Sequence, residues 1–126
     1  MTTNREKLDD AKRRYLEAKQ EIEVLRSAIA AETCPLKIGE TITVVDDGSE
    51  YKGVIEHIGP ANSGQELLDP VVGAEPGWAA GGSRINKTTG QPGKWSFGIN
   101  SFEAKLVAGN WVVKRQTQTL EDILGK

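Results

Sequence analysis

The sequence predicts an α+β protein in which a long N-terminal helix precedes a small antiparallel β-barrel and a short C-terminal helix. Residues 1–33 contain no glycine or proline, and their apolar side chains recur at helical spacing. Residues 34–115 hold 13 of the 14 glycines and all five prolines, and their apolar side chains alternate as in strands. We therefore divide the chain into a helix (1–33), a β domain (34–115) and a tail (116–126).

The first segment predicts a single helix with the repeat of a coiled coil. Its apolar residues are separated by alternating steps of three and four residues, the heptad spacing of helices that pack against each other. Thr3 or Asn4 can cap its start, and Pro35 ends it because the residue before a proline avoids helical geometry. The apolar seam consists of Leu8, Ala11, Tyr15, Ala18, Ile22, Leu25 and Ile29.

This seam has two interpretations. Its regularity favours packing against the helix of a second chain, which predicts a homodimer. The alternative is a helix that lies on the β domain of its own chain. The alanines of the seam bury little apolar area each, so the pairing of two helices would be weak unless the β domains contribute.

The middle segment predicts a small barrel. Five or six short strands separated by glycine-rich turns favour a strongly bent antiparallel sheet that closes on itself. Residues 59–77, with three prolines and four glycines, are expected to form a long loop. The strand candidates are residues 41–45, 51–58, 78–86, 94–99, 102–107 and 111–115.

Individual residues indicate how these strands are connected. Gly48 supplies a positive φ for the first turn, and Gly109-Asn110 marks a two-residue hairpin. Gly53 indicates a bulge or a close approach of two segments. Ala104 and Leu106 alternate with charged residues, so we expect both to lie on the buried face of their strand.

The tail predicts a helix of one to two turns. Thr119 can cap it, with Asp122 three residues further on, and Gly125 can end it. This helix either docks on the β domain or inserts into the groove of a partner. Its apolar side consists of Leu120, Ile123 and Leu124.

Residues 36–58, LKIGETITVVDDGSEYKGVIEHI, resemble the opening of a KOW-type, SH3-like barrel. The features shared are Gly39 before the first strand, Gly48 in the turn, and Tyr51 and Gly53 in the second strand. The resemblance implies an SH3-like barrel that binds RNA, ribosomes or proteins, although this stretch is acidic. The whole plan, a heptad helix before a small barrel, also resembles small accessory proteins of phages and prophages. That likeness implies a host protein as partner, which is inhibited or redirected.

Composition and charge limit the function classes. A net charge of −2, from 16 basic and 18 acidic residues, excludes a strongly basic nucleic-acid binder. The N-terminal sequence MTTNREKLDD is not a signal peptide and no apolar run is long enough to span a bilayer, so we expect a cytoplasmic protein without a membrane partner. A lone cysteine, Cys34, fits a reducing compartment, and together with a single histidine, His57, it argues against a zinc site.

Charge is unevenly distributed along the β domain. Residues 40–75 carry one lysine and eight acids, for −7, and residues 77–115 carry six basic residues and one acid, for +5. Aromatic side chains beside cations in the second stretch predict a binding surface. The alternative is that the tryptophans fill the core and the cations are solvated. The proposed partner-binding residues are Trp78, Arg84, Lys94, Trp95, Trp111 and Arg115.

No constellation of residues predicts catalysis, a cofactor or a metal. Residues 77–84 are glycine-rich and end in an arginine, but without a Walker pattern we interpret Gly81-Gly82 as a bend in the sheet. The acids at 46, 47 and 50 are interpreted as a hairpin turn and not a cation site. Cys34 and His57 lack activating partners in the sequence.

These observations predict a non-catalytic interaction protein that binds another protein. The alternative is a KOW-like module that binds RNA or DNA or associates with a ribonucleoprotein. A third possibility is a small-ligand binder, for a nucleotide, at residues 77–84.

Overall fold

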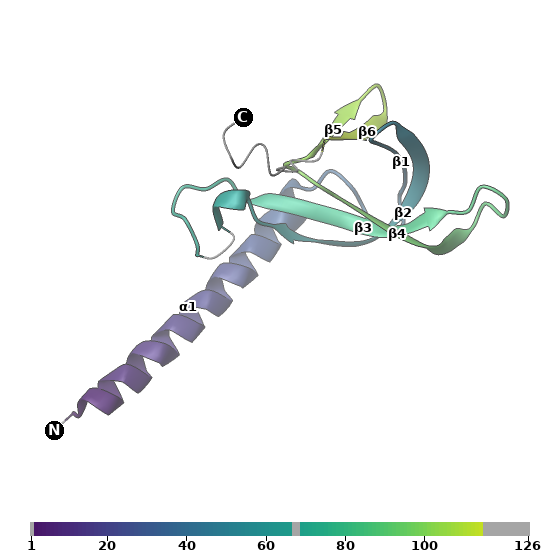
Figure 1. Ribbon diagram of the computed structural model, residues 1–126. Coiled ribbons are helices and arrows are strands. Elements are labelled where there is room, and N and C mark those ends of the chain that lie inside the picture. Colours follow the sequence, from purple (N-terminus) through teal and green to yellow (C-terminus); the bar gives the residue numbers. More distant parts are fainter. Residues whose placement is uncertain (1, 67–68, 115–126) are drawn as a thin grey trace, which may run out of the picture.

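The computed structural model describes residues 2–66 and 69–114. One helix precedes a six-stranded sheet, which confirms the α+β class with an N-terminal helix (Figure 1). The predicted C-terminal helix and Arg115 lie outside the described residues. The elements are α1 (Asn4–Thr33), β1 (Thr41–Asp46), β2 (Ser49–Ala61), the 3₁₀ turn η1 (Gly64–Glu66), β3 (Gly77–Ile85), β4 (Pro92–Asn100), β5 (Ala104–Val107) and β6 (Asn110–Val113).

The ends of α1 follow from its sequence. Thr3 is the N-cap, and its side-chain oxygen accepts a hydrogen bond from the Glu6 amide at 3.1 Å. Cys34, immediately before Pro35, takes an extended conformation with ψ 123° and ends the helix, as predicted. Its amide still donates to the carbonyl of Ala30 at 2.9 Å.

The strands form one open sheet in the order β4-β3-β2-β1-β6-β5. The predicted closed barrel is wrong, because in the described residues the two edge strands, β4 and β5, are not paired with each other. The prediction of a wholly antiparallel sheet is also wrong, since β1 and β6 pair in parallel, with Val44 opposite Trp111. Residues 101–103 link β4 to β5, and from this turn the two strands diverge (Figure 1). β5, with only four residues, is too short to close the sheet.

Two hairpins have turns with two successive positive φ angles. Asp47 and Gly48 have φ of 52° and 81°, and Ala108 and Gly109 have φ of 51° and 83°. Turns of this kind match the right-handed twist of the flanking strands. The first turn is the predicted one, whereas the second begins one residue earlier than predicted, at Ala108.

The glycine-rich stretch 77–84 lies within strand β3 and does not form a loop. β2 bulges at Glu56, between Ile55 and His57, opposite Gly82 and Gly81. A Cβ atom on Gly82 would overlap the backbone of the bulged strand. These glycines are therefore needed where β2 and β3 bend together, which agrees with the interpretation as a bend.

The core lies on the concave side of the bent sheet. Trp78 and Trp111 pack edge to face, with ring centroids 5.7 Å apart, and the Phe97 ring covers Gly53 at the predicted close approach. Leu106 lies opposite Trp111 yet is 59% exposed, so its expected burial is wrong; β5 is an edge strand, and no described segment covers it. The buried apolar residues are Ala30, Leu36, Ile42, Val44, Ile55, Trp78, Ala80, Phe97, Ile99, Ala104, Trp111 and Val113.

Candidate functional site

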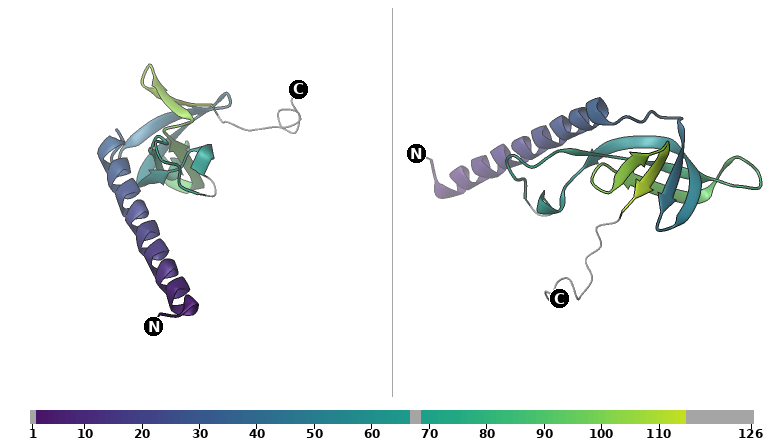
Figure 2. Two further views of the ribbon diagram at one scale, coloured as in Figure 1. Left: turned by 90° about the vertical axis from the view of Figure 1, so that its left-hand side faces the viewer. Right: turned by 90° about the horizontal axis from the view of Figure 1, so that it is seen from above.

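The helix α1 extends far beyond the sheet. Its last turns contact β2 and β3, whereas residues 4–21 are all exposed. Figure 2 shows this part projecting away from the strands in both views. At 1.5 Å per residue, these 18 residues form an exposed rod about 27 Å long.

The seam is divided between the docked and the exposed parts of the helix. Ile22 and Ile29 are half-buried against the sheet, and neighbouring Ala30 is fully buried. Leu8 and Tyr15 occupy the same seam but are exposed. A heptad falls only about 20° short of two full turns, so these residues stay on one face over three heptads. The side of α1 that is half-buried at Ile22 and Ile29, both a positions, therefore continues uncovered towards the N-terminus, whereas Leu25 at a d position is exposed.

Both interpretations of the seam thus apply to different parts of α1. The last turns dock on the β domain of the same chain, as the intrachain interpretation predicts. The first two heptads are available for another molecule. Of the remaining seam residues, Ala11, Ala18 and Leu25 are exposed.

An ion pair joins the helix to the loop after β2. A guanidinium nitrogen of Arg26 lies 2.6 Å from a carboxylate oxygen of Glu66, and the side chains are only 16% and 8% exposed. The same carboxylate oxygen accepts the Val71 amide at 3.0 Å, and Arg26 also pairs with Glu23 at 3.1 Å. This pair could not be predicted from the sequence, because Glu66 lies 40 residues away from Arg26 in a loop without periodicity.

A groove of about 250 Å³ lies between the exposed helix and the loop after β2. Tyr15, Ala18 and Ile22 of the seam line its helical side, and Asn62 and Pro70 line the loop side. Where the seam passes the loop after β2, a groove therefore separates the two, and the helix does not pack flat against the loop.

Two of the predicted partner-binding residues lie in the core. Trp78 and Trp111 are each 7% exposed, so they do not belong to the surface on which the sequence analysis placed them. They are buried positions of β3 and β6, and the alternative interpretation, core tryptophans, holds for both. Trp95 differs: its side chain is 69% exposed on β4.

Of the predicted cations, the two within the described residues, Arg84 and Lys94, each lie over an aromatic ring. The Lys94 ammonium is 5.7 Å from the centroid of Trp95, and the Arg84 guanidinium is 4.0 Å above Tyr51. Ser83, next to Arg84, pairs with Ser96, next to Trp95, so the two cation–aromatic pairs come from adjacent strands.

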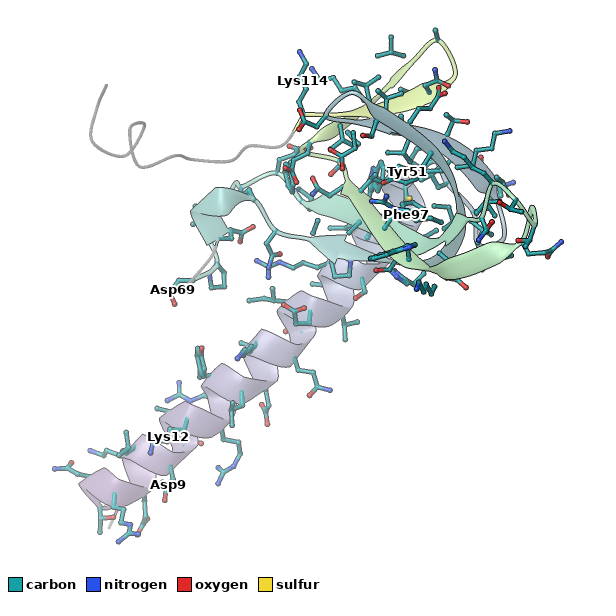
Figure 3. The ribbon with its side chains drawn as sticks, turned by 45° about the vertical axis from the view of Figure 1, so that its right-hand side comes forward. Asp9, Lys12, Tyr51, Asp69, Phe97 and Lys114 are labelled. Atoms are coloured by element: carbon teal, nitrogen blue, oxygen red, sulfur yellow. The ribbon has the colours of Figure 1, made fainter. Side chains whose placement is uncertain are left out.

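The predicted basic surface is interrupted by acids. Arg84 and Tyr51 border a hollow of about 780 Å³, which Asp46, Asp47 and Lys114 also line. Figure 3 shows Tyr51 and Phe97 inside the curve of the sheet and Lys114 at its rim. The mixture arises because the acidic strands β1 and β2 lie in the middle of the sheet, between strands of the basic stretch.

The remaining candidates for chemistry offer little reactivity. Burial raises the pKa of the Cys34 thiol, and the nearby Glu40 carboxylate raises it further against one backbone hydrogen bond, so the thiol stays protonated at neutral pH. The acids at 46, 47 and 50 flank the first hairpin turn, as interpreted. Within residues 2–66 and 69–114, no three His, Cys, Asp or Glu side chains are grouped to hold a metal ion.

Comparison with family models, curated proteins and solved structures found no match to this chain. In the described part of the chain, α1 is not apolar enough to cross a membrane.

Proposed function

We propose that this chain is a non-catalytic interaction protein whose exposed helical seam binds a helix of another molecule. One observation carries the proposal: residues 4–21 continue the sheet-facing side of α1 into solvent with their apolar seam uncovered.

The energetics of a projecting helix support this proposal. In proteins, most of the stability of a helix comes from tertiary packing of its apolar face, which residues 4–21 lack. Exposed pairs such as Arg14 and Asp10, at 3.1 Å, contribute only about 0.2–0.5 kcal/mol each. Packing of a second helix on Leu8 and Tyr15 would supply the apolar burial that these turns lack.

Site-specific photo-crosslinking tests this function. A photoreactive phenylalanine analogue replaces Tyr15 in the full chain, and a matched control carries it at Lys87 in the exposed β3–β4 turn. We expect adducts from position 15 that Leu8→Asp abolishes, because a charge cannot be buried in an apolar seam. Equal adducts from both positions, or adducts unaffected by Leu8→Asp, would contradict the proposal.

A second candidate function is single-stranded nucleic-acid binding through Trp95, Lys94 and Arg84. The observation that favours it is the exposed Trp95 ring beside a lysine, an arrangement that suits a stacked base. Oligonucleotide binding that weakens with salt and is lost in Trp95→Ala would support this function.

A further inference from the structure

The charges beside the exposed seam identify what covers it. With Leu8, Tyr15 and Ile22 at the a positions of the heptad, the e and g positions form the two borders of the seam. Every charged e position is basic, and two of the three charged g positions are basic. The e positions are Arg5, Lys12, Lys19 and Arg26, and the charged g positions are Lys7, Arg14 and Glu21.

Of the acidic residues in the exposed part, only Glu21 lies on a border of the seam; the others, including Glu6 at an f position, lie behind it. Asp9 occupies a b position, and Asp10 and Glu17 occupy c positions, which point away from the interface of a two-stranded coil. Asp10 lies 3.1 Å from Arg14 and 3.6 Å from Arg13, and all three side chains remain mostly exposed. Asp10 offsets part of the charge of Arg14 on one border, and Arg5, Lys7, Lys12 and Lys19 keep the borders basic.

A second copy is a poor occupant in the parallel orientation. There the g residue of one helix meets the following e residue of the other, which places Lys7 opposite Lys12 and Arg14 opposite Lys19. The one attractive combination, Glu21 with Arg26, needs an arginine that is already held by Glu66 at 2.6 Å.

The antiparallel orientation does not remove the repulsion. There e residues meet e residues, and all four charged e residues are basic. At the g positions, attraction between Lys7 and Glu21 is offset by the approach of two copies of Arg14. Like charges facing each other across an interface disfavour a partner, so both orientations work against a second copy.

We propose that the exposed seam of α1 docks an acidic α-helix of a different protein, and not a second copy of this chain. The proposal rests on the proposed function, that the seam binds a helix, and it replaces the expected homodimer. A protein helix fits better than nucleic acid, because Leu8, Ala11, Tyr15 and Ala18 form an apolar strip between the basic borders. Phosphates would neutralise the borders but leave this strip in water.

Two synthetic peptides test the proposal with the full chain. Both have about four heptads with Ile at a and Leu at d, and they carry either Glu or Lys at every e and g position. Fluorescence anisotropy measures the binding of each peptide. We expect the Glu peptide to bind at least about tenfold more tightly than the Lys peptide.

Charge reversal on the chain provides the matched test. The variant Lys12→Glu/Lys19→Glu should prefer the Lys peptide, whereas the control Lys87→Glu/Lys105→Glu, with the same change in net charge, should retain the original preference. In sedimentation velocity, the unmodified chain should be a monomer at tens of micromolar. The helix variant should dimerise, because it places carboxylates opposite Lys7 and Arg14 of the second copy.

Several results would overturn the proposal. A dimer of the unmodified chain would make the second copy the occupant. Equal affinity for both peptides would show that the charges at the e and g positions do not select an acidic partner. A single-stranded oligonucleotide that displaces the Glu peptide, and that the helix variant no longer binds, would assign the seam to nucleic acid. If neither peptide binds and Leu8→Asp leaves the crosslinking from position 15 unchanged, the proposed function itself fails.

Discussion

The ion pair between Arg26 and Glu66 predicts an asymmetric response to mutation. Arg26→Met removes the charge but keeps an unbranched, helix-compatible side chain. The Glu66 carboxylate, which is 8% exposed, then loses the Arg26 guanidinium and keeps the hydrogen bond from the Val71 amide. Breaking a buried ion pair in this way costs about 3 kcal/mol.

The reverse substitution should cost less. Glu66→Gln leaves Arg26 paired with Glu23, whose side chain is 56% exposed, and the amide oxygen can still accept the Val71 amide. We therefore expect a loss of about 1–2 kcal/mol in the free energy of unfolding. Arg14→Met is the matched control: its partner Asp10 is 57% exposed, so the loss should stay below about 0.5 kcal/mol.

Urea denaturation of the three variants measures these differences. Tryptophan fluorescence reports on the core through Trp78 and Trp111, and circular dichroism at the same urea concentrations reports on the helix. A double-mutant cycle between positions 26 and 66 should give a coupling of about 1 kcal/mol or more. Stability of Arg26→Met within about 0.5 kcal/mol of the unmodified chain would refute the reasoning that this buried pair stabilises the contact between α1 and the loop after β2.

Three further predictions concern the β domain and the segment between α1 and β1. Ala108→Gly should raise the free energy of unfolding by about 1 kcal/mol, because Ala108 has a φ of 51° that disfavours side chains; an unchanged urea midpoint would contradict this. Trp111→Ala should lower stability by about 3–5 kcal/mol, whereas Trp95→Ala, at an exposed position, should change the melting temperature little; equal losses would contradict the assignment of core and surface. Cys34 should be alkylated more slowly at pH 8 than a free cysteine, since its raised pKa leaves less thiolate, and native chain alkylated as fast as unfolded chain would exclude this.

The local features of the fold could be predicted from the sequence. The absence of glycine and proline before Pro35 gives the extent of α1, and Thr3 gives its cap. Gly48 gives the first turn, because a positive φ is a property of single residues and their neighbours. Gly53 predicts either a bulge or a close approach of two segments, and the Phe97 ring packed on Gly53 shows that it is a close approach.

Long-range pairings could not be predicted in this way. Nothing in the alternation of β6 shows that it pairs in parallel with β1 or that β4 and β5 stay unpaired. The alternation of apolar and charged residues predicts that Leu106 is buried. It is exposed because it lies on an edge strand that no described segment covers. Glu66 has no pattern that relates it to Arg26, so only the folded chain shows the contact.

The candidate site was predicted in part. The seam from Leu8 to Ile29 follows from spacing alone, but where the sheet ends along the helix decides which seam residues are exposed. Composition could not separate Trp95 from Trp78 and Trp111, because burial depends on the position of each strand in the sheet.

Hydrogen exchange of the full chain tests the central claim most directly. Backbone amides of residues 4–21 should exchange rapidly in the free chain and become protected when the Glu-bordered peptide is added. Residues 22–33, which already dock on β2 and β3, should change little and serve as the internal control. Unchanged exchange at residues 4–21 with saturating peptide, or protection that appears only in the β strands, would contradict the claim that the exposed seam of α1 is the interaction site.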